Sequence, residues 1–314
     1  MTLAPLDLKG INNPKKLNIV KALMSGYPLS RSEAASICGV SKVTVGKVAA
    51  ELIARDLVVA EKYSVGMGKL TEFISPSDTL TALVICLSRN RISSAILDFS
   101  ENILFECSQS VNSSLPYEAS VYAFLQELYP QTSEITDISL SKVAILCEGS
   151  LKSQIDLASV INTVSPFETD AILDYDHSCA DALCRLYPSN TILLVQVRED
   201  ISLTLICNKN ILPKNPSSIT HTNVNRPDSL ASHIAELVSP IFKAAMPDRI
   251  IIDSDALIVD KAFCEKILDG LARKSRVTRD DLPPIESSRD IGYAMLEALE
   301  ILKEQVFREL SGIE

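Results

Sequence analysis

The stretch SRSEAASICGVSKVTVGKVAAELIARDLV, residues 30–58, decides the fold of the first part of the chain. It begins with Ser30 and has Glu33 three positions later, which is the capping-box pattern at the start of a helix. This pattern predicts a helix over residues 31–38. Gly39 then provides a tight turn, because glycine adopts the left-handed backbone conformation that ends many helices.

The residues after this turn predict another helix. Ser41 is a good helix cap, and the apolar residues that follow recur at a spacing of three and four positions. They form one buried stripe, which consists of Val45, Val48, Ala49 and Leu52. Similar spacing predicts an earlier helix over residues 14–25, which Gly26 and Pro28 end.

Two strand-like runs, residues 58–63 and 70–74, follow the helices and flank the loop SVGMGK. Helices followed by such a hairpin are the plan of a winged helix-turn-helix domain, in which one helix enters the major groove of DNA. A helical hairpin with a purely structural role is the alternative, because short helix pairs around a glycine turn are common.

A recognition helix needs an outer face that is free of bulky apolar side chains. Polar residues away from the buried stripe meet this need, and basic residues in the preceding helix and in the wing can reach phosphates. The expected DNA contacts are Arg31, Ser41, Lys42, Thr44, Lys47 and Lys69. Gly46 costs about 1 kcal/mol relative to alanine inside a helix. Either close backbone approach to DNA or crowding against a neighbouring helix would explain this glycine.

Charge is distributed unevenly along the chain. The net charge of −10 by itself argues against a nucleic-acid partner. Residues 1–75, however, hold ten Lys and Arg and six Asp and Glu, a net charge of +4 that leaves −14 for the rest. A basic segment attached to an acidic body is the asymmetry expected when only one part meets phosphates, although four charges also suit a solvated face.

Residues 12–75 resemble the N-terminal domain of repressors of the ROK family (repressor, open reading frame, kinase). The positions that follow the family pattern are Ser30-Arg31, Glu33, Ala35, Gly39-Val40-Ser41, Thr44-Val45, Leu52-Ile53 and Leu57-Val58. Asp56 replaces a glycine of the pattern, and Lys69 stands where the family has the arginine of its wing. The resemblance implies a DNA-binding domain ahead of a body that is similar to the ROK sugar kinases.

The rest of the chain repeats one order of elements. Three hairpin-linked strands, a helix and a further strand open each lobe of the actin-like ATPase fold, to which ROK sugar kinases belong. The corresponding runs are residues 80–87, 91–99, 103–111, 117–129 and 143–147, and weaker copies follow at 191–197, 201–207, 230–244 and 248–254. The predicted fold class is therefore α/β, with an N-terminal winged helix-turn-helix domain followed by a two-lobed actin-like body. The predicted domains are 1–78, a first lobe at 79–188 that the C-terminal helix at 291–314 completes, and a second lobe at 189–290.

The glycines that a ROK kinase uses to hold ATP are missing. The resemblance implies phosphate-binding glycines in two hairpins, where the backbone must approach the phosphates without a Cβ in between. Cys86 and Ser88 occupy the first of these places, and the second hairpin, VQVREDISLTLI, also lacks glycine. We therefore expect no nucleotide cofactor and no enzymatic activity.

The sugar site that the resemblance implies is eroded too. In LDYDHSCADAL, Asp176 falls on the family's catalytic aspartate and Tyr175 on its asparagine. In SITH, His221 falls on a zinc ligand of the family and Ser218 on a sugar-binding glutamate, but the zinc-binding cysteines are absent, so we expect no metal. Asp176 and His221 are the candidate remnants of a ligand site. Asp176 either binds a hydroxyl of a sugar-like ligand or caps the helix that follows it.

Composition indicates a cytoplasmic protein. The 314 residues are 46% apolar, no apolar run reaches the length of a membrane span, and the first residues lack a signal-peptide core. The eight cysteines are scattered without a C-x-x-C pair, which favours small buried hydrophobes over a zinc site.

These patterns together predict a transcriptional regulator, most simply a repressor. One recognition helix contacts too few bases for a specific site, which predicts a homodimer on a palindromic operator in double-stranded DNA. The body would supply dimerisation and could sense a sugar-like effector. The alternatives are a protein-interaction scaffold that carries a winged helix and, less favoured, a divergent sugar kinase.

Overall fold

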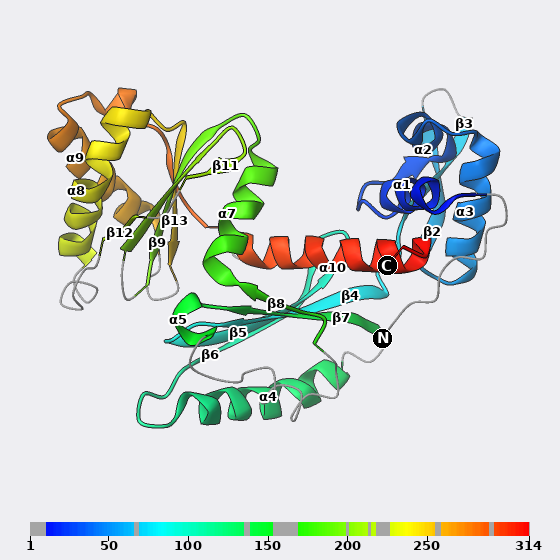
Figure 1. Cartoon of the computed structure of the whole chain (residues 1–314), viewed down its shortest axis with the longest axis horizontal. Helices are drawn as coiled ribbons and strands as arrows, with labels where there is room; N and C mark the ends of the chain where they lie inside the picture. The colour runs from blue at the N-terminus through cyan, green and yellow to red at the C-terminus, as the bar shows by residue number, and fades with distance from the viewer. Residues whose placement is uncertain are drawn as a thin grey trace.

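The computed structural model describes residues 11–65, 69–134, 139–152, 169–198, 201–212, 215–217, 227–254, 259–288 and 292–313. Within this part, the strands form one small sheet and two larger mixed sheets, and a long helix runs between the N-terminal domain and the junction of the larger sheets (Figure 1). None of the helices in these ranges is both long and apolar enough to cross a bilayer.

Capping residues set where two of the N-terminal helices begin, as the sequence predicts. The Ser30 hydroxyl accepts a hydrogen bond from the Glu33 backbone N–H at 3.2 Å, and the Glu33 carboxylate accepts one from the Ser30 N–H at 2.8 Å. This confirms the capping box, and Gly39 ends the helix with a φ of 63°. Ser41 caps the next helix, whose predicted stripe is fully buried. The helices are α1 (Asn13–Leu23), α2 (Arg31–Cys38) and α3 (Lys42–Ala54).

A hairpin completes this domain. Its strands are β2 (Val58–Val65) and β3 (Lys69–Pro76), and the short strand β1 (Leu29–Ser30) pairs with β3. The element order is that of a winged helix-turn-helix domain. Both hairpin strands are longer than the sequence predicts, because cross-strand pairing continues to Val65 and Lys69 beside the hairpin tip and to Val58 and Pro76 at the other end.

The first large sheet has the order β6-β5-β4-β7-β8, with β4, β5 and β6 antiparallel and β7 and β8 parallel to β4. Helix α4 covers one face, and α10 and α7 pack on the other side (Figure 1). Helix α4 continues beyond the predicted end through Pro130. The elements are β4 (Leu80–Leu87), β5 (Arg91–Asp98), β6 (Ile103–Ser110), α4 (Tyr117–Glu134), β7 (Ser139–Cys147), α5 (Gly149–Lys152), β8 (Ala171–Asp174), α7 (Tyr175–Leu186) and α10 (Tyr293–Ser311).

The second large sheet repeats this plan, with the order β11-β10-β9-β13-β14 and β12 paired to β10. Helices α8 and α9 pack on one face, so closely that a Cβ added at Gly270 would lie 2.8 Å from the Ala235 Cβ. The elements are β9 (Thr191–Val197), β10 (Ile201–Cys207), β11 (Asn210–Ile211), β12 (Asn215–Ser217), α8 (Pro227–Ala245), β13 (Arg249–Ser254), α9 (Lys261–Ser275), η1 (Arg279–Asp281) and β14 (Ile285–Ser287). Two such sheets with flanking helices confirm the predicted α/β, actin-like fold class. We propose the boundaries 1–78, 79–188 and 189–290 for the domains, because each sheet falls within one of them.

Helix α10 joins the N-terminal domain to the body. One hydrophobic cluster runs from α1 through α10 into the first lobe and includes Leu23 and Phe307. The Phe307 ring meets the edge of the Phe99 ring at a centroid distance of 6.3 Å. Polar contacts reinforce this packing, because Lys21 of α1 lies 2.7 Å from Glu304 of α10. The two parts are therefore held together by a shared core as well as by surface contacts.

Candidate functional site

The exposed face of α3 carries the residues that the sequence predicts for DNA contact. Lys47 is exposed on the side away from the buried stripe, and Lys42 and the capping residue Ser41 are exposed at the start of the helix. Thr44 is half-buried, with its backbone N–H 3.1 Å and its hydroxyl 2.9 Å from the Ser41 hydroxyl. The Ser41 and Thr44 side chains are therefore partly used in fixing the start of the helix.

Val43 contradicts the expectation of an outer face without bulky apolar groups. Its side chain is 70% exposed, between the two polar residues that begin α3. The exposure of Val43 could have been predicted from the sequence. Position 43 lies off the buried stripe, so an apolar residue there cannot pack into the core. The face of α3 therefore presents both cations and one branched apolar side chain.

Gly46 lies on the same helix, and its surroundings separate the two explanations for it. A Cβ built there would meet only the Arg31 guanidinium, at 4.0 Å, among the described residues. Crowding against a neighbouring helix is therefore wrong as an explanation. The space outside the backbone at this position is open.

The two basic residues expected to reach phosphates differ in how they are placed. Arg31 begins α2, and its Nη2 lies 2.8 Å from the carboxylate of Glu72 on β3. Arg31 therefore forms an ion pair with the hairpin, which the sequence did not predict. Lys69 is the first residue of β3, and its backbone pairs with Val65 beside the hairpin tip.

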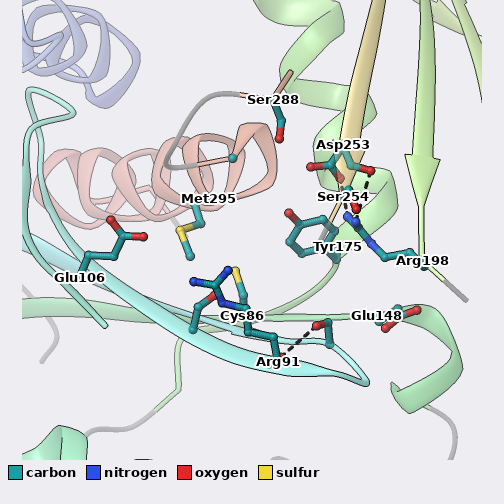
Figure 2. Close-up of a pocket in the computed structure, with 13 residues that line it drawn as sticks. Cys86, Arg91, Glu106, Glu148, Tyr175, Arg198, Asp253, Ser254, Ser288 and Met295 are labelled. Carbon is teal, nitrogen blue, oxygen red and sulfur yellow. Dashed lines mark hydrogen bonds and ion pairs between the residues drawn. The ribbon is translucent and has the colours of Figure 1, made fainter. Parts of the chain in front are cut away.

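A separate cavity of about 130 Å³ lies in the body, where the two lobes and the start of α10 meet (Figure 2). Cys86 and Ser88, which the resemblance puts in place of a phosphate loop, line one side of it. The other residues around it are Arg91, Ser93, Glu106, Glu148, Tyr175, Arg198, Asp253, Ser254, Ser288, Gly292 and Met295. The cavity thus occupies the region where the resemblance would place the nucleotide phosphates.

A buried ion pair forms the wall of this cavity on the second lobe. Arg198, at the end of β9, is paired with Asp253 of β13 and also donates to the carbonyls of Val197 and Asp253, at 3.2 and 3.3 Å. Its guanidinium lies 4.9 Å from the centroid of the Tyr175 ring (Figure 2). The arginine is thus held in place by an anion, two carbonyls and an aromatic face.

Burial raises the pKa of two groups at the cavity. It raises the pKa of the Tyr175 phenol well above its ordinary value, and the Asp253 carboxylate adds to this effect. Burial likewise raises the pKa of the Cys86 thiol, again with a contribution from Asp253. Both groups are therefore protonated at neutral pH, so the tyrosine is a hydroxyl donor and the cysteine is a poor nucleophile.

Asp176 does not have the capping role that was one of its two predicted roles. The cap of α7 is Asp174, whose carboxylate accepts from the His177 backbone N–H at 2.9 Å. The helix begins at Tyr175, so the capping position falls two residues before Asp176. The Asp176 carboxylate instead accepts from the Gln196 side-chain amide at 3.0 Å, which ties α7 to β9. Tyr175, not Asp176, reaches the cavity.

The second candidate remnant, His221, lies outside the described residues, as does Ser218. Among the residues that are described, no three His, Cys, Asp or Glu side chains converge as a metal site would require. All eight cysteines are free thiols, and Cys86, Cys147, Cys179 and Cys264 are buried as small hydrophobes. The remaining four are half-buried.

The geometry defines a class of protein, a winged helix-turn-helix domain packed on a two-lobed actin-like body. No protein-family model matches the sequence, and neither does any curated protein. Among solved structures, the crystal structure of a ROK family transcriptional regulator, a homolog of the E. coli MLC protein, aligns with a TM-score of 0.61 and 12% identity. The alignment covers 96% of this chain and 98% of that one. The chain therefore has the fold of a ROK family transcriptional regulator over nearly its whole length.

Two further structures align with part of the chain. The ethanolamine utilization protein EutJ from Carboxydothermus hydrogenoformans has a TM-score of 0.50 and 10% identity, over 72% of this chain and 89% of that one. A ROK family glucokinase from Streptomyces griseus, in complex with glucose and AMPPNP, has a TM-score of 0.47 and 9% identity, over 70% and 98%. At such identities a likeness shows the fold and does not define an activity.

Proposed function

We propose that the chain is a DNA-binding transcriptional regulator of the ROK type that acts as a homodimeric repressor on a palindromic operator. The observation that carries this proposal is the exposed surface of α3, where Val43 and Lys47 lie opposite a fully buried stripe and Lys42 is exposed in the first turn. Solvent-facing lysines on the helix that follows a tight glycine turn are placed as in known recognition helices.

Each part of this face has a role in the proposal. Lys42 and Lys47 contact phosphates or the acceptor edge of guanine, and Val43 contacts a thymine methyl group. Gly46 allows a sugar-phosphate strand to approach the helix backbone, since a Cβ would stand in that open space. Arg31 adds a phosphate contact when the DNA backbone competes with Glu72 for its guanidinium.

The body is proposed to dimerise and to sense an effector without catalysis. Two features support this role over that of a sugar kinase. The Cys86 and Ser88 side chains stand at the cavity where the family has its first phosphate loop. In addition, Arg198 is committed to a buried ion pair, so its charge is not available to a transferring phosphoryl group.

A second candidate is a protein-interaction scaffold. Tyr27 and Ile37 of the N-terminal domain are 77% and 66% exposed, and large apolar side chains in the open can also mark a protein contact. This reading needs no DNA, so one experiment separates the two functions.

The test is selection of double-stranded DNA from a random library with the full chain, followed by mobility shifts at several salt concentrations. We expect enrichment of a palindrome and an affinity that falls steeply with salt. Lys47→Glu should weaken binding at least tenfold. The matched control is Lys261→Glu, a charge change at an exposed lysine that begins α9 in the body.

Two results would contradict the proposal. One is a selection without enrichment, which would favour the scaffold. The other is an equal loss of affinity in the Lys47 and Lys261 variants, because a general charge effect would then explain the binding. Melting curves of both variants verify that the fold is retained.

A further inference from the structure

The cavity between the lobes carries two charged groups that are not part of the ion pairs described above. Arg91 and Glu106 both line it, and neither makes an ion pair with a described residue. The Arg91 guanidinium donates to the Ser108 hydroxyl at 2.6 Å. Figure 2 shows the guanidinium rising from the sheet toward the centre of the cavity, with the Glu106 side chain on the same side.

Strand pairing explains why these two groups lie near each other. Arg91 on β5 is opposite Ser110 on β6, but its long side chain reaches along the sheet to Ser108, which is two residues from Glu106 on the same strand. Residues two apart on one strand are separated by roughly 6.8 Å. A cation and an anion on one face of the first-lobe sheet are therefore both within reach of a single small ligand.

The opposite wall of the cavity supplies hydroxyl groups. The Tyr175 phenol and the Ser288 hydroxyl both border the cavity, and neither makes a side-chain hydrogen bond with a described residue. Tyr175 is held by its ring, which lies under the Arg198 guanidinium. Its hydroxyl is thus fixed in position and remains available to a ligand.

The charges around the cavity limit what the ligand can carry. Arg198 and Asp253 neutralise each other, which leaves Arg91 as the cation against Glu106 and Glu148. A phosphate dianion would therefore meet a lining with a net charge of −1. A single carboxylate matches the planar donors of one arginine and brings half the charge.

We propose that this cavity binds a small hydroxy acid, with its carboxylate on Arg91 and its hydroxyls on Glu106, Tyr175 and Ser288. As an effector site this assignment rests on the proposed regulator function, but binding to the cavity can be measured without DNA. Gly292 and Met295, at the start of α10, border the same cavity, so a ligand there touches the helix that holds the N-terminal domain.

The experiment is calorimetric titration of the full chain with two matched pairs of probes, D-glycerate against glycerol and D-gluconate against D-glucitol. Within each pair, only the acid carries a carboxylate. We expect at least one acid to bind with a Kd below about 1 mM and its polyol to bind at least tenfold more weakly, since a hydrogen-bonded charge contributes roughly 10- to 100-fold. Inorganic phosphate should bind more weakly than the acid.

Variants assign the contacts. Arg91→Gln should weaken binding of the acid by about 10- to 100-fold, and Tyr175→Phe, which keeps the ring, should weaken it severalfold. Arg273→Gln, at an exposed arginine on α9, is the control and should bind like the parent chain. Melting curves check that each variant is folded.

Several outcomes would overturn the assignment. These are equal binding of an acid and its polyol, no binding of either acid at 10 mM as a rough upper concentration, tighter binding of phosphate, or equal losses in the Arg91 and Arg273 variants. None of these outcomes changes the result of the mobility-shift assay. A failure of the ligand-site assignment can therefore be distinguished from a failure of the DNA-binding proposal.

Discussion

The ion pair between Arg31 and Glu72 should restrain DNA binding, and Glu72→Gln should release it. The guanidinium and the carboxylate are 2.8 Å apart, and the side chains are 44% and 32% exposed. An exposed pair of this kind contributes only about 0–1 kcal/mol to folding. Its loss should therefore leave the melting temperature nearly unchanged.

The effect on binding can be worked out from counterion release. One added phosphate contact makes the slope of log K against log salt steeper by about 0.9. At ~0.1 M salt this corresponds to an affinity gain of at most about eightfold. The assay is a mobility shift on the selected operator across a salt series, and both the affinity and the slope should change.

Glu61→Gln is the matched control, because it removes the same charge from the same hairpin. Glu61 pairs with Phe73 and Glu72 with Lys62, so successive positions place the two carboxylates on opposite faces of the hairpin. Equal gains in the two variants would show that overall charge is responsible. An unchanged slope in Glu72→Gln would show that Arg31 does not contact a phosphate.

Three further predictions concern a glycine in α3, a buried ion pair and the packing of α10. Gly46→Ala should stabilise the chain by about 0.5–1 kcal/mol, seen as a higher melting temperature, and should weaken operator binding; unchanged binding would contradict close backbone approach. Asp253→Asn should cost about 3–5 kcal/mol in a denaturant titration, since it removes the carboxylate charge that faces the buried Arg198 guanidinium; a loss below about 1 kcal/mol would refute this. Phe307→Ala should cost about 3–5 kcal/mol and speed hydrogen exchange in α1, and protection that stays as in the parent chain would show that α10 does not support that helix.

The parts of the fold that short segments encode could be predicted from the sequence. The side chains of Ser30, Glu33 and Ser41 form hydrogen bonds with backbone groups three positions away, so a short stretch of sequence is enough to predict their capping roles. The strands β4, β9 and β10 have their predicted bounds, because each is a largely buried run rich in Leu, Ile and Val that ends at polar turn residues. The fold class followed from the order of such segments.

The contacts that define the candidate sites could not be predicted in the same way. Arg31 meets Glu72 only because β1 pairs with β3 and brings the start of α2 beside the hairpin. Asp174 is the N-cap of α7 because β8 extends to that residue and the helix begins directly after it. No local sequence pattern favours Asp174 over Asp176 as the cap. Tyr175 and Arg198 are 23 positions apart and meet through the placement of α7 against β9. Such pairs depend on tertiary packing, which cannot be predicted from the spacing of residues in the sequence.

The position of α10 has a consequence for synthesis of the protein. The Asn13 side chain donates to the Gly312 carbonyl at 2.8 Å, across 299 positions of sequence. At about 5–20 residues per second, the ribosome needs roughly 15–60 s to make the partner that covers α1. During that time α1 packs on α2 and α3 but lacks the cover that α10 provides, so the N-terminal domain is completed only after the rest of the chain. A truncated translation product would then carry an incompletely packed N-terminal domain, which favours its removal by proteases over its accumulation.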